Sequence, residues 1–268
     1  MTAKAAGTKT ALITGASAGI GRELAFVFAE HGHDLILVAR SSDKLEDLAG
    51  EVRRRYARAV EVVAMDLGVA GAARRLYDEL ASRGLQVEIL VNNAGVGAFK
   101  PFGETDCADI TQMIQLNVMA TTELTRLLVP EMVERGHGRI LNLASVAAFV
   151  PTPLCSVYGA TKAFVLSFTE ALSEELSGRG VSVSALCPGV VDTEMVRGAG
   201  ETLGHPDAVP SFLMLDPRQV AREGYQACME GEVIHINGFT YEAVVQWMRL
   251  QPRWFVRKLI GFLARRYR

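Results

Sequence analysis

The sequence is 268 residues long, with 49% hydrophobic residues, 22% charged residues and a net charge of −2 at neutral pH. This length suffices for one large α/β domain with a buried core, and the near-neutral charge gives no reason to expect a nucleic-acid partner. Residues 1–9 lack the hydrophobic stretch of a signal peptide, and no apolar run is long enough to predict a membrane-spanning helix.

Short hydrophobic runs alternate with amphipathic stretches along the chain. The hydrophobic runs predict strands at residues 10–14, 34–39, 60–64, 88–91, 139–143 and 181–186. Helical spacing predicts helices at 22–31, 41–56, 70–83, 106–136 and 156–176, with Pro130 as the point where the fourth would break. The alternation predicts an α/β, single-domain Rossmann-type fold, a doubly wound parallel sheet with helices on both faces.

Polar and glycine residues follow the predicted strands. In a parallel sheet of this kind, ligands bind beyond the carboxyl ends of the strands. The residues that follow strands are Gly15, Arg40, Asp66, Asn92, Ser145 and Pro188. We therefore expect residues that lie far apart in the sequence to gather at one edge of the sheet.

The turn after the first predicted strand is rich in glycine, reading TGASAGIG at residues 14–21. It follows a strand and opens a helix, which is the context that a dinucleotide-binding turn requires. Glycines there let the backbone approach a pyrophosphate at the helix N-terminus, whereas the alternative is a tight turn without a ligand. We expect a dinucleotide to be bound here by Gly15, Ser17, Ala18, Gly19 and Gly21.

The end of the second predicted strand indicates which dinucleotide is bound. It carries Arg40 and Ser41 where a carboxylate would favour NAD(H). A guanidinium can bind the 2′-phosphate of NADP(H) with two hydrogen bonds, although a solvated loop arginine is the alternative. We therefore favour NADP(H) over NAD(H). Asp66 is expected to accept from the adenine amino group and Leu67 to pack on the ring, with a helix N-cap as the competing role for Asp66.

Tyr158 and Lys162 are separated by one helical turn, and Ser145 precedes them by a short interval. Residues four apart lie on the same helix face. A nearby ammonium lowers the pKa of a phenol, so we expect Lys162 to lower the pKa of Tyr158 toward neutrality. A phenol tuned in this way can exchange a proton with a substrate oxygen.

Taken together, these motifs resemble the short-chain dehydrogenases/reductases of the roughly 250-residue type over residues 8–235. The matching residues are Thr14-Gly15-x-x-x-Gly19-x-Gly21, Asn92-Asn93-Ala94-Gly95, Asn117, Ser145, Tyr158-x-x-x-Lys162, and Pro188-Gly189 with Thr193. The glycine spacing differs from the G-x-x-G-x-x-G turn of the sugar-nucleotide epimerase branch. Within the family, segment 212–268 is most similar to bacterial relatives of the long-chain 3-ketoacyl and 17β-hydroxysteroid reductases.

The resemblance implies a role for each matching residue. Tyr158 would be the general acid in reduction and the base in oxidation, and Lys162 would also bind the nicotinamide ribose. Ser145 would hydrogen-bond the substrate carbonyl, and Asn117 would hold a proton-relaying water. The cofactor site would be completed by Ile20, Asn92, Asn93, Ala94, Gly95, Pro188, Gly189, Val191 and Thr193. Taken singly, Asn117 could instead bridge backbone groups, and Ser145 could be a turn residue.

The C-terminal third carries the substrate side and an unusual tail. The resemblance places a substrate lid at about residues 195–217, where Met195, Phe212, Leu213, Met214 and Leu215 hint at an apolar substrate. We assign residues 1–242 to the catalytic domain and 243–268 to a basic amphipathic tail that has no Asp or Glu. A tail of this kind, with tryptophans, suits an anionic membrane surface, and docking on its own domain or on a neighbouring subunit is the alternative.

We expect an NADP(H)-dependent oxidoreductase that transfers a hydride between nicotinamide and a carbonyl or secondary alcohol, with an apolar ketone as substrate. The resemblance implies a homodimer or homotetramer. The alternatives are a catalytically silent NADP(H) sensor and a membrane-associated scaffold. Four widely spaced cysteines indicate a cytoplasmic protein with reduced thiols. The histidines show no metal-ligand spacing, so no metal is expected, and His31 and His33 are expected at the solvated surface.

Overall fold

The computed structural model describes residues 9–202 and 213–265, which form a seven-stranded parallel sheet. The strand order is β3-β2-β1-β4-β5-β6-β7. The strands are β1 (Thr10–Thr14), β2 (Asp34–Ala39), β3 (Val60–Ala64), β4 (Ile89–Asn92), β5 (Gly138–Leu143), β6 (Val181–Cys187) and β7 (Ile234–Ile236). The predicted doubly wound fold is thus confirmed, with one additional edge strand.

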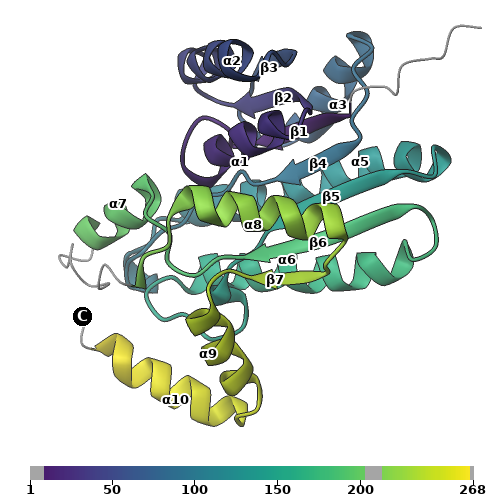
Figure 1. Cartoon of the computed structure of the whole chain (residues 1–268). Helices are drawn as coiled ribbons and strands as arrows, with labels where there is room; N and C mark the ends of the chain where they lie inside the picture. Colours follow the sequence, from purple (N-terminus) through teal and green to yellow (C-terminus); the bar gives the residue numbers. More distant parts are fainter. Residues whose placement is uncertain (1–8, 203–212, 266–268) are drawn as a thin grey trace, which may run out of the picture.

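Helices cover both faces of the sheet (Figure 1). One face packs against α1 (Gly19–Glu30), α2 (Ser42–Tyr56) and α8 (Pro217–Glu230). The opposite face packs against α3 (Ala72–Ser82), α5 (Thr121–Glu134) and α6 (Ser156–Glu175). The remaining helices are α4 (Cys107–Ile114), α7 (Glu194–Thr202), α9 (Phe239–Arg249) and α10 (Arg253–Ala264), and the short turns are η1 (Phe102–Glu104) and η3 (Val146–Ala148).

The chemistry of α8 shows how the sequence defines a helix. Asp216 is the N-cap, its carboxylate accepting from the backbone N–H of Arg218 at 3.2 Å, and Pro217 occupies the first turn. Gly231 ends the helix with φ 73°, a conformation that glycine adopts without steric cost. The helix packs on α1, where Phe28 is completely buried and meets the ring of Tyr225 edge to face. Truncating such a buried ring to alanine typically costs about 3–5 kcal/mol.

The long helical stretch predicted at 106–136 is irregular at a different place than expected. It consists of α4, a π-helical segment η2 (Gln115–Ala120) and α5, and α5 continues through Pro130. The predicted break at Pro130 is therefore wrong, and the irregularity lies in the π segment that carries Asn117. π-Helical turns inside helices are frequent at functional sites.

The sequence prediction also missed structure in the C-terminal third. Strand β7 is only three residues long, too short for its pattern to be recognised. The tail expected from residue 243 is two helices, α9 and α10, of which α9 begins at Phe239. Among the described residues, no helix has the length and hydrophobicity needed to cross a membrane.

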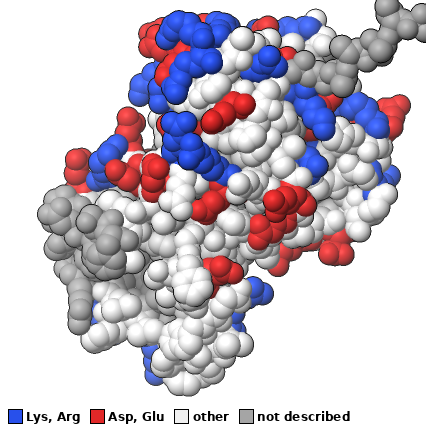
Figure 2. Space-filling model, in the orientation of Figure 1, with Lys and Arg blue, Asp and Glu red and all other residues white. Residues whose placement is uncertain are grey.

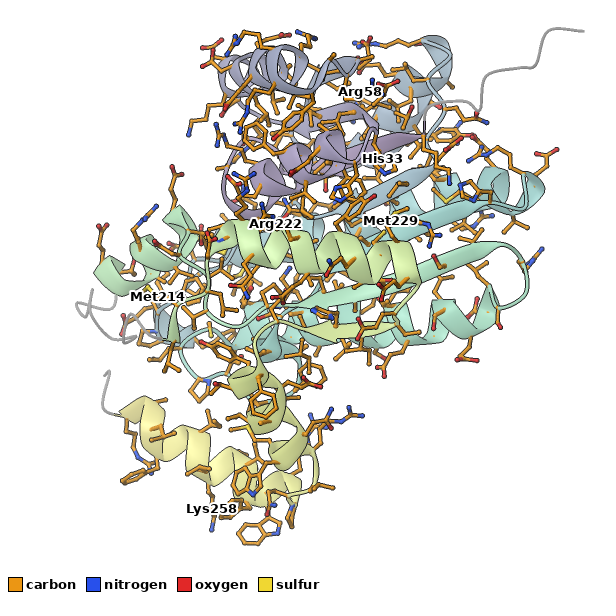
Figure 3. All side chains as sticks on the ribbon, in the orientation of Figure 1. His33, Arg58, Met214, Arg222, Met229 and Lys258 are labelled. Atoms are coloured by element: carbon orange, nitrogen blue, oxygen red, sulfur yellow. The ribbon has the colours of Figure 1, made fainter. Side chains whose placement is uncertain are left out.

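His33 is buried, which corrects the expectation of a solvated histidine. It is 5% exposed and lies at the junction of α1 and α8 (Figure 3). Its Nε2 is 3.2 Å from the hydroxyl of Tyr225, and its Nδ1 is 3.2 Å from the carbonyl oxygen of Lys9. Burial lowers the pKa of His33. This histidine therefore joins the N-terminal strand to α8, a contact between residues nearly two hundred positions apart.

Candidate active site

A cleft of about 440 Å³ opens at the carboxyl edge of the sheet, where the sequence placed its ligand site. The predicted residues that line it are Gly15, Ser17, Ala18, Gly19, Ile20, Arg40, Ser41, Asp66, Leu67, Asn93, Ala94, Gly95, Ser145, Tyr158, Lys162, Pro188, Gly189, Val191 and Thr193. Gly21 and Asn117 lie behind this lining, and Asn92 points into the sheet interior. The fold thus brings together segments that span almost 180 residues of sequence.

The glycine turn is shaped by its contact with the loop after β4. The side-chain nitrogen of Asn93 (Nδ2) donates to the carbonyl oxygens of Thr14 (2.9 Å) and Gly15 (3.1 Å). A Cβ on Gly21 would lie 2.3 Å from that nitrogen, and Gly15 has φ 66°. These two glycines are therefore required by the packing of the turn itself. The backbone around them faces the cleft, as an approaching pyrophosphate requires.

Asn92, the neighbour of Asn93, belongs to a buried polar chain between β4, β5 and the helices behind them. Its side-chain nitrogen donates to Thr125 at 3.1 Å and to the side-chain oxygen of Asn142 at 2.9 Å. Asn142 in turn donates to Thr169 at 2.9 Å. Because all four residues are buried and hydrogen-bonded, this chain holds the central strands in register behind the cleft.

Two cations line the cleft beyond the end of β2. Arg40 follows β2, and Lys44 extends from the first turn of α2. Neither forms an ion pair with any residue that the structure describes. The sequence prediction missed Lys44, which lies in the first turn of the helix that follows Arg40. Together they offer two positive charges to a ligand.

Asp66 is not the cap of the following helix. Helix α3 begins at Ala72 with Gly71 as its N-cap, so the competing role for Asp66 is wrong. One oxygen of its carboxylate accepts from the backbone N–H of Gly68 at 2.8 Å, which fixes the turn after β3. Leu67 is 4% exposed and belongs to the core, with its remaining surface in the cleft.

Tyr158, Lys162 and Ser145 face one another at the other end of the cleft. The ammonium of Lys162 lies 5.7 Å from the centroid of the Tyr158 ring and donates to the carbonyl oxygen of Leu143 at 2.6 Å. Ser145 is held by the backbone N–H of Ala147, which donates to its hydroxyl at 3.1 Å. The three side chains come from the end of β5 and from α6, so the strand and the helix fix their relative positions.

The expected lowering of the Tyr158 pKa is wrong. Burial raises this pKa to about 12, and a hydrogen bond with Ser145 counteracts the rise only in part. Burial also lowers the pKa of Lys162 to about 8. Desolvation is the largest cause of both shifts, and the ammonium is directed at the carbonyl of Leu143.

Asn117 serves a backbone-bridging role in this structure. Its side-chain oxygen accepts from the N–H of Val96, and its nitrogen donates to the carbonyl of the same residue, both at 2.9 Å. The nitrogen also donates to Thr161 at 3.1 Å, on the helix of Tyr158 and Lys162. A Cβ on Gly95 would lie 3.3 Å from the oxygen of Asn117 and 3.5 Å from the Lys162 nitrogen. Asn117 thereby joins the loop after β4 to the helix that carries Tyr158.

A second cavity of about 390 Å³ shares Val96, Glu194 and Met195 with the cleft. The rest of its lining combines Phe99 and Met113 with the polar Lys100, Asp109 and Gln112. The ring of Phe99 lies 5.8 Å from that of Tyr158. The ends of the expected lid are fixed, because Leu215 pairs with Val191 and its N–H donates to the carbonyl of Val190 at 2.8 Å. Residues 203–212, including the expected lid residue Phe212, lie outside the described residues.

Tyr241 of α9 packs against Gly189, a residue that lines the cleft. A Cβ on Gly189 would lie 2.3 Å from its ring, and its hydroxyl donates to the carbonyl oxygen of Leu213 at 2.8 Å. It therefore connects the nicotinamide side predicted at Gly189 to the end of the lid. No local sequence signal identified this residue, since its partners are 28 and 52 positions away.

A family model described as short chain dehydrogenase matches residues 9–204. The chain belongs to this family. Among its relatives, the very-long-chain 3-oxoacyl-CoA reductase of Homo sapiens is 33% identical over 248 residues, which cover 90% of this chain and 77% of the relative. The sequence-based assignment to the short-chain dehydrogenases is thus confirmed, including its proximity to the long-chain ketoacyl reductases.

Solved structures of short-chain dehydrogenases resemble this chain along most of its length. A short-chain dehydrogenase from Sphingobium yanoikuyae in complex with NADPH has a TM-score of 0.80 at 33% identity, covering 90% of this chain and 94% of its own. The bulky-bulky ketone specific alcohol dehydrogenase from Comamonas testosteroni has a TM-score of 0.76 at 29% identity, covering 90% and 92%. The chain is accordingly an oxidoreductase that acts on CH–OH and carbonyl groups, and neither comparison supports the sensor or scaffold alternative.

Proposed function

We propose that this short-chain dehydrogenase is an NADP(H)-dependent reductase of apolar ketones. The observation that carries the proposal is the convergence of Tyr158, Lys162 and Ser145 on a cleft that also contains the glycine turn. A proton donor and a dinucleotide-binding turn in one cleft are the two parts that carbonyl reduction needs.

The residues of the cleft suit NADP(H). The backbone of the glycine turn would hold the pyrophosphate, and Arg40, Ser41 and Lys44 would bind the 2′-phosphate. Lys162 would bind the ribose hydroxyls, and the segment from Pro188 to Thr193 would bound the nicotinamide. When bound, NADPH supplies the hydride. The unpaired charges of Arg40 and Lys44 favour the phosphorylated dinucleotide over NAD(H).

Tyr158 would donate the proton to the substrate oxygen. With its pKa raised to about 12, the phenol is protonated throughout the neutral range. Reduction consumes the proton of the phenol, whereas oxidation requires the phenolate. Ser145, whose hydroxyl is held beside Tyr158, would hydrogen-bond the carbonyl oxygen as negative charge develops on it. Asn117 would act by holding the Val96 loop against the helix of Tyr158.

The second cavity is the natural place for an apolar substrate chain. Its lining includes the apolar side chains of Phe99, Met113 and Met195 and shares Val96, Glu194 and Met195 with the cleft. Lys100, Asp109 and Gln112 add polar groups to the same lining. The names of the relatives support this class, since they include a very-long-chain 3-oxoacyl-CoA reductase and a dehydrogenase specific for bulky ketones. An acyl chain is therefore the substrate portion that we assign to this cavity.

We further propose a homodimer or homotetramer that pairs through the faces of α4, η2 and α6. Large apolar side chains are exposed there, at Ile114 (44%), Met119 (40%) and Phe164 (42%). Such a grouping suits a subunit contact. Light scattering coupled to size exclusion would measure the mass, and a Phe164→Glu variant should shift it toward the monomer. A wild-type protein that elutes as a monomer would contradict this assignment.

The test of function is NADPH oxidation with 3-oxoacyl thioesters of increasing chain length, and with NADH as the comparison cofactor. We expect kcat/KM to rise with chain length, because each methylene that is buried against Phe99, Met113 and Met195 contributes up to about 0.8 kcal/mol, or about fourfold. A Met113→Glu variant should flatten this dependence. Equal rates for short and long chains would refute the assignment of the cavity, and faster turnover with NADH would refute the assignment of the cofactor.

A further inference from the structure

Helices α9 and α10 lie outside the two layers that cover the sheet (Figure 1). Helix α9 is joined to the catalytic body by Tyr241, through Gly189 and Leu213. Within the pair, Val245 and Val256 are buried, at 3% and 5% exposure. The pair is therefore ordered by its own contacts and by the wall of the cleft, while much of its surface stays free.

That free surface carries large apolar side chains. Leu250 is 82% exposed, Trp254 59%, Trp247 47% and Leu263 43%. Single exposed apolar residues are common, but several on one helical pair form a patch of the kind that marks an interaction site. Figure 2 shows this lobe as mostly uncharged, with Lys and Arg at its margins.

The charges on this pair are positive except for Glu242 in the first turn of α9. Residues 243–268 contain no Asp or Glu, and the exposed cations of the pair include Arg249, Arg253, Arg257 and Lys258. None of these four forms an ion pair with a residue that the structure describes. The ammonium of Lys258 lies 5.8 Å from the ring centroid of Trp254 and faces away from the sheet (Figure 3). Cationic side chains thus stand beside exposed aromatic rings.

We propose that α9 and α10 dock on the surface of an anionic lipid membrane. Tryptophan and leucine side chains gain free energy on entering the boundary between headgroups and acyl chains, and arginine and lysine bind the lipid phosphates. A second copy of the chain fits less well, because a two-fold contact between these surfaces would bring together the four cations of each copy, while the described part of the pair offers one acid, Glu242.

Docking in this manner sets the cleft beside the membrane, because Tyr241 ties α9 to the cleft wall. An apolar ketone dissolved in the bilayer would then have a short path to the second cavity. This consequence rests on the proposed function, whereas the docking itself does not.

Intrinsic fluorescence reports on this surface alone, since the two tryptophans of the chain are Trp247 and Trp254. The experiment adds POPC or mixed POPC–POPG vesicles to the full chain and measures the emission maximum and co-sedimentation. We expect a blue shift and co-sedimentation with POPC–POPG vesicles, and binding at least about tenfold weaker with POPC alone or at high salt. No shift and no co-sedimentation with POPC–POPG would overturn the proposal.

Matched charge reversals identify the surface that binds. The triple variant Arg253→Glu/Arg257→Glu/Lys258→Glu should lose binding about tenfold or more. The control Arg54→Glu/Arg126→Glu/Arg222→Glu makes the same change in net charge at exposed sites elsewhere and should bind as the wild type does. NADPH titration checks that both variants are folded and separates this test from that of the proposed function. An equal loss of vesicle binding in both variants would overturn membrane docking. A concentration-dependent blue shift in the absence of vesicles, abolished only in the first variant, would also overturn it, because it would indicate self-association.

Discussion

The sharpest prediction concerns the buried ammonium of Lys162. Its pKa is lowered from 10.5 to about 8 on folding, so the folded state disfavours the charge that the unfolded chain carries. The free energy of unfolding is therefore highest above pH 10.5, where Lys162 is neutral in both states. It decreases as the pH falls from 10.5 to 8, because the unfolded chain takes up a proton that the folded protein does not. From this shift, linkage gives a destabilisation of about 3 kcal/mol at pH 7 and about 1 kcal/mol at pH 9.5.

Replacing Lys162 by methionine removes this charge and should abolish reduction. The carbonyl oxygen of Leu143 loses its donor at the same time, at a cost of about 1–3 kcal/mol that does not depend on pH. The net change at any one pH is therefore small. The informative quantity is the difference in unfolding free energy between Lys162→Met and the wild type, which should fall by about 2 kcal/mol from pH 7 to pH 9.5.

Urea denaturation of the protein without cofactor, at several pH values, measures this difference. Tyr158→Phe is the matched control in the same site. The Tyr158 pKa is raised to about 12, so the contribution of Tyr158 to stability is fully present below pH 10 and is lost only above it. The difference in unfolding free energy between Tyr158→Phe and the wild type should therefore stay constant from pH 7 to pH 9.5. A Lys162→Met difference that stays constant between pH 7 and 9.5 would refute the argument that burial disfavours the ammonium.

Three further outcomes follow from the cleft. Tyr158→Phe should lower kcat by about 10²–10⁴-fold in stopped-flow reduction with NADPH affinity nearly unchanged, and retained turnover would remove Tyr158 as the acid. Arg40→Asp should shift the kcat/KM ratio from NADPH toward NADH by at least about tenfold, and adding Lys44→Ala should weaken NADPH further; an unchanged ratio would contradict the charge argument. Gly21→Ala places a Cβ 2.3 Å from the Asn93 amide and should destabilise the protein by about 1–3 kcal/mol in thermal unfolding, with an unchanged Tm showing that the turn can relax.

The sequence by itself determined the architecture and the edge of the sheet where the site lies. Strands buried on both faces are hydrophobic throughout, so each can be recognised from its own residues without knowledge of its neighbours. The topology of a parallel sheet then places the residue after each strand at one edge, which is why Gly15, Arg40 and Ser145 were found without coordinates.

Only the tertiary structure decided what those residues experience. The requirement for glycine at 21 comes from Asn93, some seventy residues away, and the pKa values of Tyr158 and Lys162 follow from burial that no spacing reveals. The sequence predicts an exposed His33, because its partner Tyr225 lies 192 positions away and no local pattern indicates that contact. The hydrophobic pattern of a segment indicates which of its own residues are buried. The desolvation of a side chain and its contacts with distant residues depend on which segments pack together, and only the folded chain determines this.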